Sequence, residues 1–246
     1  MKTSRYIAAA AILIVIVYLT YFVHFYVFLG YAISDDSEAW GQLGDFVGGI
    51  LNPLLSFVSI ALLIKSLSLQ NEANKNLRIE LKNNEKTEKL RSFEVLFFNL
   101  VNSQKNLFDS FRIEFESEGK LALLMGVEAV MKIEDDIEEI RKKEGEDQQV
   151  SDYLDEVDRK DQIFGLSRAF YIIVRMISEK ISDAEGFTCA ERKAHYMSLV
   201  NFTDFAQLRL VMICVQFMDF ESTKYLRSAK EFKAAVEELG LRYELY

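Results

Sequence analysis

No lysine or arginine occurs between Arg5 and Lys65, and this stretch opens with a predominantly apolar run from Tyr6 to Ile33. The run is 28 residues long. As an α-helix it would measure about 42 Å, more than the ~30 Å hydrocarbon core of a bilayer. A cleavable signal peptide would share the basic start, but its apolar core is only about 7–15 residues. We therefore expect an uncleaved membrane-spanning helix over about residues 6–33.

A second apolar segment covers about residues 46–67, and the connection between the two segments is acidic. Residues 34–45 contain four acids and no lysine or arginine. On their other sides the two segments are flanked by basic residues, namely Lys2, Arg5, Lys65, Lys75 and Arg78. Because basic flanks stay on the cytoplasmic side, the sequence predicts a multi-pass protein of the cell inner membrane with both termini in the cytoplasm.

The helix breakers of the chain are concentrated around the second segment. Residues 40–57, WGQLGDFVGGILNPLLSF, hold the only tryptophan, the only proline and four of the eleven glycines. Small and polar residues at helical spacing form one face, which consists of Gly44, Gly48, Asn52, Ser56 and Ser59. The helix-breaking residues Gly49 and Pro53 adjoin this face and complete the candidate site. Small and polar residues let helices approach closely in lipid, and a proline leaves a carbonyl one turn back without its helical partner. We expect a kinked helix that packs against protein.

Three interpretations of this face are open. It could pack the second helix on the first. It could join several copies of the chain, so that Asn52, Ser56 and Ser59 line a polar path. It could also bind an ion, although no charged side chain lies inside the segment. Asp45, at its outer mouth, could collect cations or be an ordinary exposed carboxylate.

The remainder of the chain reads as helical. Residues 69–92 are mostly polar, with a thin row of Ala73, Leu77 and Leu81 at a spacing of four, which predicts a solvated helical stalk or a weak coiled coil. The next helix should be amphipathic, because apolar residues recur on one side at Phe93, Phe97, Leu100, Leu107 and Phe111.

Later helices are predicted from apolar spacing over residues 161–181, 189–200, 205–220 and 229–239. Thr188 with Glu191, and Ser228 with Glu231, have the capping-box spacing, and Gly240 can end the last helix. Residues 210–218 are apolar but too few for a third span. No alternating strand pattern is found. The predicted fold class is all-α: a transmembrane hairpin (1–68), a juxtamembrane stalk (69–92) and a cytoplasmic helical domain (93–246).

The net charge of −9 has a local origin, because residues 133–158 contain twelve acids and three basic residues. The rest of the chain is neutral, so the basic footprint of a nucleic-acid binder is missing and no strong direct binding of nucleic acid is expected. The acidic segment is interpreted as an exposed helix followed by a mobile loop around KKEGEDQQ. A docking surface for a basic partner is the alternative.

Motifs that carry chemistry are not found. There is no phosphate loop, paired-histidine metalloprotease motif, CxxC or nucleophile elbow. Cys189 and Cys214 are far apart, which favours buried thiols in a reducing compartment. His195 lies among charged neighbours without a second ligand or nucleophile nearby. The sequence therefore predicts no enzyme, no cofactor and no metal site.

Two motifs carry a resemblance to a known family. The outer turn and second span match a W-G-x-x-G-D-F-x-G-G-x-x-N-P pattern, at Trp40, Gly41, Gly44, Asp45, Phe46, Gly48, Gly49, Asn52 and Pro53. An F-E-x-x-F-F pattern follows at Phe93, Glu94, Phe97 and Phe98. In these motifs the chain resembles the phage abortive-infection membrane proteins, and in particular the two-transmembrane effectors encoded beside retron reverse transcriptases. The resemblance covers roughly residues 35–115.

The resemblance implies an anti-phage toxin with a defined partner. A retron reverse transcriptase with its RNA–DNA hybrid would hold the toxin silent, and release on infection would let it damage the membrane. From the residues themselves we expect membrane lipid and further copies of the chain as partners. A non-toxic membrane-tethered adaptor that recruits another protein is the alternative function.

Overall fold

The computed structural model describes residues 3–117, 120–244 and 246, and it divides into two compact units, Met1–Lys82 and Asn83–Tyr246. Lys2, one of the basic residues used to predict topology, lies outside the described residues. The division falls inside one long helix, ten residues before the end of the predicted stalk. Each unit has its own apolar core and is described separately.

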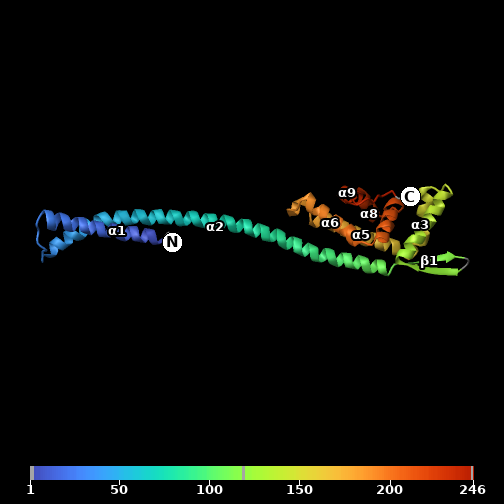
Figure 1. Ribbon diagram of the computed structural model, residues 1–246, viewed down its shortest axis with the longest axis horizontal. Helices are drawn as coiled ribbons and strands as arrows, with labels where there is room; N and C mark the ends of the chain where they lie inside the picture. The colour runs from blue at the N-terminus through green and yellow to red at the C-terminus, as the bar shows by residue number, and fades with distance from the viewer. Residues whose placement is uncertain (1–2, 118–119, 245) are drawn as a thin grey trace. The chain divides into compact units, whose positions relative to one another are not determined.

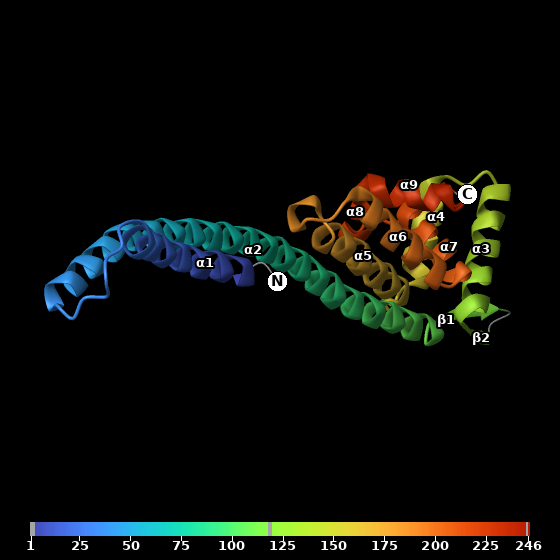
Figure 2. The ribbon, with the colours of Figure 1, turned by 60° about the vertical axis from the view of Figure 1, so that its left-hand side comes forward.

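The N-terminal unit is a helical hairpin. Helix α1 (Thr3–Phe22) continues into a π-helical segment, η1 (Val23–Phe28), and helix α2 begins at Ser37. Figures 1 and 2 both show α1 alongside the first part of α2. Two helices in the described residues are long and apolar enough to cross a membrane, Ala8–Phe28 and a window within Ser37–Asp109. Two membrane-spanning candidates are thus confirmed.

The connection between the two membrane-spanning candidates begins and ends at earlier residues than predicted. The first helical segment ends at Phe28 rather than Ile33, and Gly30 adopts a positive φ of 66°, a conformation that favours glycine. Helix α2 begins nine residues before the predicted start of the second span. The connection is therefore residues 29–36, and the motif residues predicted in an outer turn lie in the first turns of a helix.

Helix α2 (Ser37–Asp109) is 73 residues long and continues through Pro53. The residues predicted as a stalk are helical throughout. The C-terminal unit takes its first helix from the end of α2. Its other elements are β1 (Arg112–Ser117), β2 (Lys120–Met125), α3 (Gly126–Lys142), α4 (Asp147–Val157), α5 (Gln162–Lys180), η2 (Asp183–Glu185), α6 (Cys189–Phe202), α7 (Phe205–Phe217), α8 (Glu221–Ser228) and α9 (Lys230–Glu238).

Helix α7 is the centre of the C-terminal unit and packs against α3, α4, α5 and α8. Leu208, Val211 and Met212 face one apolar cluster with α2, α5, α6, α8 and α9. Leu210 and Ile213 face a second cluster with the hairpin, α3, α4 and α5. A helix that is apolar all round is a buried helix. The prediction of a core helix over residues 210–218 is confirmed. Helices α6 and α7 taken together are also long and apolar enough to cross a membrane, but they are bent by 113° where they meet.

The end of α2 presents the predicted amphipathic face, with one error. Phe93 and Phe97 are buried as expected, but Leu107 is exposed. The buried face continues instead through Val101, Gln104 and Phe108. Residues 97, 101, 104 and 108 follow the 3.6-residue period more closely than the predicted set. Gln104 is accommodated because its Nε2 donates a hydrogen bond of 3.1 Å to Thr203 Oγ1.

A β-hairpin lies where no strand was predicted. Strands β1 and β2 pair antiparallel, with Ile113 opposite Leu124 and Phe115 opposite Ala122. Ile113 and Phe115 are buried in the second cluster, while the alternate residue Glu114 is exposed. The prediction was wrong because the alternation in RIEF covers only four residues, which is too short to be distinguished from an amphipathic helix end.

The acidic segment is better ordered than predicted. It forms α3 and α4, joined by a short turn, and Ile133, Ile137, Val150 and Leu154 are fully buried. The expected loop is confined to residues 143–146, between the two helices. Gly145 in the turn donates its backbone N–H to Ile140 O at 3.0 Å and accepts a hydrogen bond from Arg141 Nη1 at 2.8 Å. Most of the acids lie on the outer face of a packed helical pair, but Asp158 is buried and accepts hydrogen bonds from Ile163 N and Phe164 N.

The predicted helix ends are largely confirmed. Thr188 and Glu191 form a capping box at the start of α6. Gly240, with a φ of 80°, follows the end of α9, and Leu241 N donates to Val236 O at 3.1 Å, the pattern of a Schellman turn. The second predicted capping box is wrong, because α9 begins at Lys230 with Ala229 as its N-cap. Glu231 is engaged elsewhere.

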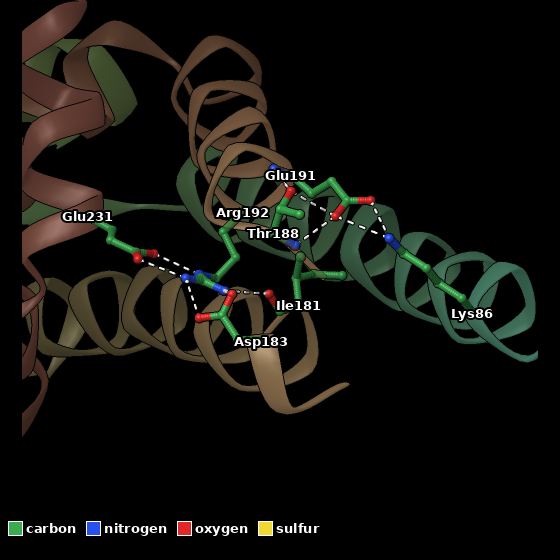
Figure 3. A network of polar contacts seen from close by, with 7 residues as sticks. All are labelled: Lys86, Ile181, Asp183, Thr188, Glu191, Arg192 and Glu231. Atoms are coloured by element: carbon green, nitrogen blue, oxygen red, sulfur yellow. Dashed lines mark hydrogen bonds and ion pairs between the residues drawn. The ribbon is translucent and has the colours of Figure 1, made fainter. Parts of the chain in front are cut away.

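Glu231 is held by Arg192 of α6, the most buried charged group of the polar network in Figure 3. The Arg192 side chain is only 9% exposed. Its Nε and Nη2 donate to the two carboxylate oxygens of Glu231 at 2.7 and 2.9 Å, and its Nη1 donates to Ile181 O at 3.2 Å. Asp183 Oδ1 lies 3.2 Å from Arg192 Nη1 and is the second carboxylate paired with this guanidinium group. This bidentate pair joins α6, α9 and the α5–α6 connection.

Glu191 links the capping box to α2 in the same network. Its carboxylate accepts hydrogen bonds from Thr188 N at 2.7 Å and Thr188 Oγ1 at 2.9 Å, and Lys86 Nζ lies 2.9 Å away. Lys86 and these Thr188 donors lower the pKa of Glu191 to about 2. The carboxylate is therefore ionised under all physiological conditions. Helix α2 is thus joined to α6 by this ion pair as well as by the contact of the Phe93 ring with the His195 ring.

We predict that Gly145→Ala destabilises the C-terminal unit by about 1–3 kcal/mol, the usual cost of overpacking. A Cβ at Gly145 would lie 2.5 Å from Ile140 Cγ2 and 2.8 Å from Ile140 O. The matched control is Gly165→Ala in α5, where a Cβ meets nothing within 4 Å. Alanine there should stabilise the helix by roughly 0.5–1 kcal/mol. Thermal unfolding of the detergent-solubilised chain measures both, and equal shifts would contradict the prediction.

We also predict that Arg192→Met lowers the free energy of unfolding by about 1–3 kcal/mol, because it leaves Glu231 and Asp183 without their cation. Methionine keeps the apolar stem, so the loss reports the ion pair. The control is Arg175→Met, whose pair with Glu179 is more than half exposed on both sides. That change should leave the free energy of unfolding nearly unchanged, because exposed ion pairs contribute little. Urea unfolding distinguishes them, and an Arg192 effect no larger than the Arg175 effect would refute it.

Candidate functional site: the exposed face of the second span

The start of α2 is fixed by the motif tryptophan and by the acidic connection. Asp36 Oδ1 accepts a hydrogen bond from Glu38 N at 3.0 Å, which satisfies one free donor of the helix N-terminus. Ser34 Oγ accepts from Asp36 N at 3.1 Å, and Trp40 Nε1 donates to Ser34 O at 2.9 Å. Trp40 therefore closes the connection back onto the helix. Gly41 and Asp45 are exposed on the following turns.

The contact between the two helices of the hairpin is made by aliphatic side chains. Val17 of α1 packs with Val47 and Leu51 of α2. Leu43 and Leu55 extend the same row at a spacing of four residues, with Ile14 opposite them. The ring of Phe46 contacts Tyr21, with the centroids 5.4 Å apart. Sequence analysis missed this row, although its aliphatic i, i+4 spacing was visible beside the glycines.

The small-residue face lies next to this row, because residues 44, 48, 52 and 56 are each one position further along the chain than a residue of the row. It is hereafter called the Gly–Asn face and consists of Gly44, Gly48, Asn52, Ser56 and Ser59. All of its members except the partly covered Gly48 are exposed. A Cβ at Gly44 or Gly49 meets nothing within 4 Å, and one at Gly48 meets only Asn52 Nδ2 at 3.8 Å. The glycines are therefore not required for the approach of α1, which disfavours the first of the three interpretations.

The polar groups of this face differ in how they are satisfied. Ser59 Oγ donates to Leu55 O at 2.8 Å, so it needs no external partner. Neither the Asn52 amide nor the Ser56 hydroxyl has a side-chain hydrogen bond within the described part of the chain. Pro53 lacks an N–H, so the carbonyl of Gly49 loses its regular helical donor. In hydrocarbon each unsatisfied group costs several kcal/mol. The face thus presents donors and acceptors that require another polar surface.

The second motif, F-E-x-x-F-F, divides between core and surface. Phe93 and Phe97 are buried and both contact the His195 ring, with centroid distances of 4.9 and 6.0 Å. His195 Nδ1 also lies 2.8 Å from Glu191 O, which assigns it a packing role. Glu94 is exposed. Phe98 is half exposed and meets the equally exposed Phe202 at 5.9 Å, so these two rings form an aromatic surface.

A groove of about 810 Å³ lies between the hairpin, α3 and α4. Its charged groups neutralise one another: Lys160 Nζ is 2.6 Å from Glu114, and Lys143 Nζ is 2.7 Å from Glu139. Tyr153 OH donates to Asp136 at 2.7 Å, and burial together with that carboxylate raises the pKa of Tyr153. Among the described residues no group of three His, Cys, Asp or Glu side chains could hold a metal ion.

Comparison of the chain with protein-family models, with curated proteins and with solved structures finds no match. The resemblance carried by the two motifs is therefore not supported by an overall similarity. The defence function that the motifs imply stays a prediction, and the case for function rests on the geometry of the Gly–Asn face.

Proposed function

We propose that this protein is a membrane-embedded effector that permeabilises the membrane of its own cell when several copies associate through α2. The observation that carries the proposal is the exposure of the Gly–Asn face. Its glycines and its unsatisfied Asn52 amide lie away from the aliphatic row that holds α1. A hairpin that served only as an anchor would gain nothing from an unpaired amide in lipid, because aliphatic residues there would be more stable.

Association would satisfy this face in a specific way. Membrane insertion orients every copy alike, so α2 helices meet side by side in parallel. Gly44 and Gly48 allow close backbone approach, and the Asn52 amides can then bond across the interface or to the free carbonyl left by Pro53. In a ring of copies Asn52 and Ser56 would line the centre as a layer of polar groups. Such a layer admits water and ions where a wholly apolar seam would not.

The motif resemblance supplies the regulation in this proposal. A retron reverse transcriptase carrying its RNA–DNA hybrid would hold the effector silent from the cytoplasm, and infection would release it. Because the chain is acidic overall, contact would be made through the partner protein rather than the nucleic acid. The aromatic surface of Phe98 and Phe202 supports this part, since exposed aromatic rings are characteristic of protein interfaces.

We predict that Gly48→Leu abolishes toxicity and dye entry on expression while leaving membrane insertion intact. Leucine blocks the close approach of two α2 helices, whereas within one copy a Cβ at Gly48 meets only Asn52 Nδ2, at 3.8 Å. The matched control is Ala61→Leu, which makes a similar small-to-large change at an exposed position outside the Gly–Asn face. This variant should remain toxic. Membrane potential, propidium uptake and membrane fractionation are measured for both.

Two results of the Gly48→Leu experiment would contradict the proposal. Full toxicity of Gly48→Leu, or equal loss in both variants, would show that the Gly–Asn face is not the site of association. Asn52→Leu provides a second measure, because it removes the polar group while keeping the helix apolar. It should reduce permeability even where copies still associate.

The alternative function, a membrane-tethered adaptor, is favoured by the same aromatic surface, which needs no toxic activity to explain it. It predicts that residues 83–246 function when attached to an unrelated two-span anchor. We expect this chimaera to lose all toxicity, because the Gly–Asn face is gone. The readout is dye entry beside the native chain at matched membrane abundance. Dye entry that persists in the chimaera would show that the Gly–Asn face is dispensable and refute the effector, whereas recruitment of a protein partner by a chimaera without dye entry would support the adaptor.

A further inference from the structure

The β-hairpin of the C-terminal unit has two edges, and the register identifies the backbone groups on each. Gly126 N donates to Phe111 O at 2.8 Å, and Ile113 is opposite Leu124. Hydrogen-bonded pairs alternate along an antiparallel ladder. The N–H and C=O groups of Leu124 and Ala122 therefore point toward β1, while those of Leu123 point to the outer edge of β2. The sheet has only two strands in the described residues, so that edge has no strand partner.

The two edges are not protected equally. On β1 the outward-pointing residues include Arg112 and Glu114, and Lys160 is bonded to Glu114 at 2.6 Å. Packing of α4 against β1 covers this side further. On β2, α3 packs against the strand and Lys120 begins it, but residues 121–127 contain no charged side chain and no proline. Soluble proteins normally protect an edge with a charge, a proline or a covering element.

The surface beside this edge is apolar as well. Leu123 and Met125 are about half exposed on β2, at 53% and 49%, and Val127 and Met131 are exposed at 44% and 54% at the start of α3. Between Leu123 and Met131 the only charged side chain is that of Glu128. An open edge with flanking apolar side chains is the arrangement that accepts an additional strand, with the backbone supplying hydrogen bonds and the side chains supplying contact area.

We propose that the β2 edge binds the β2 edge of a second copy of this chain, antiparallel, with the two-fold axis at Leu123. Two hairpins would then form one four-stranded sheet. Leu123 would face Leu123 of the second copy, and the backbone of Leu121 would pair with that of Met125. The contact lies in the C-terminal unit, so it goes beyond association through the Gly–Asn face.

Self-complementarity argues for a second copy as the occupant. The outward backbone groups of residues 121, 123 and 125 are symmetric about Leu123, so one two-fold operation pairs all of them. No like charges meet, because this part of the strand is uncharged. The same operation on the β1 edge would place Glu114 against Glu114, which is unfavourable.

Weak pairing of the two β2 edges is sufficient when both copies are held in the same membrane. A six-residue strand edge buries less area than a stable dimer of soluble proteins requires. However, the two candidate spans place every copy in the same membrane, and confinement raises the effective concentration of one copy for another. An interaction too weak to dimerise a free domain can therefore join tethered domains.

Disulfide trapping of the full chain tests the proposal. Single cysteines are placed at residues 121, 123, 125 and 127 in a Cys189→Ser background, with the buried Cys214 retained. The proteins are inserted into liposomes and oxidised with copper phenanthroline. The yield of dimer should peak at Leu123→Cys, because opposed residues of a paired strand lie within disulfide range. Glu114→Cys is the matched control, since it is opposite Leu123 on the same hairpin but at the far edge.

The expected result is several-fold more dimer for Leu123→Cys than for Glu114→Cys, with less at Met125→Cys and Val127→Cys. Equal yields at 114 and 123 would indicate random collision and overturn the proposal, as would little dimer at every position. The series is repeated with Gly48→Leu added. Trapping that persists shows a contact independent of the Gly–Asn face, so failure of one proposal is distinguishable from failure of the other.

A backbone variant tests the hydrogen bonds themselves. Leu123→Pro removes an N–H that points to the open edge and leaves the ladder with β1 intact, and proline is tolerated in edge strands. Glu114→Pro removes the equivalent outward N–H of β1. Chemical cross-linking in liposomes, with Gly48→Leu present in every protein, should show a loss of dimer for Leu123→Pro only, and circular dichroism reports whether each variant folds. Unchanged association in a folded Leu123→Pro protein would refute the pairing.

Discussion

The amide of Asn52 sets the strongest constraint on how this molecule works. It lies in the apolar part of α2, on the exposed face beside the aliphatic row, and has no hydrogen-bond partner in the described part of the chain. Lipid offers no donors or acceptors, so the group must be satisfied by protein or by water that protein admits. Both solutions require another polar surface beside α2, which association of several copies would supply in the proposed function.

The C-terminal unit is built on a different principle. Helix α7 is buried on nearly every side, so it carries both apolar clusters and needs a helix or hairpin on each face. Some of its buried polar groups are paired: Arg192 holds Glu231, and Gln104 Nε2 donates to Thr203 Oγ1. This unit therefore has the packing of an independent soluble core. Its exposed features, the Phe98–Phe202 surface and the open edge of β2, are confined to its periphery.

Together these features describe a chain whose interactions are left incomplete in a single copy. The N-terminal unit exposes the Gly–Asn face, and the C-terminal unit exposes an unprotected strand edge. The proposed self-association satisfies both, and it does so through separate contacts with different chemistry: small residues and amides in lipid, backbone hydrogen bonds and apolar side chains in water. A partner that covers either contact could hold the copies apart.

The sequence by itself determined the features that depend on composition and period. The two spans follow from apolar length, the core position of α7 from its all-round apolarity, and the Thr188 cap from a local spacing. Residue spacing also identified the Gly–Asn face, but it did not show whether this face contacts α1 or remains exposed. Only the tertiary structure decided that α1 packs on Val47 and Leu51, that Leu107 is exposed, and that residues 112–125 form a hairpin. These outcomes depend on which surfaces meet in three dimensions, and adjacent rows on one helix are equivalent until a partner occupies one of them.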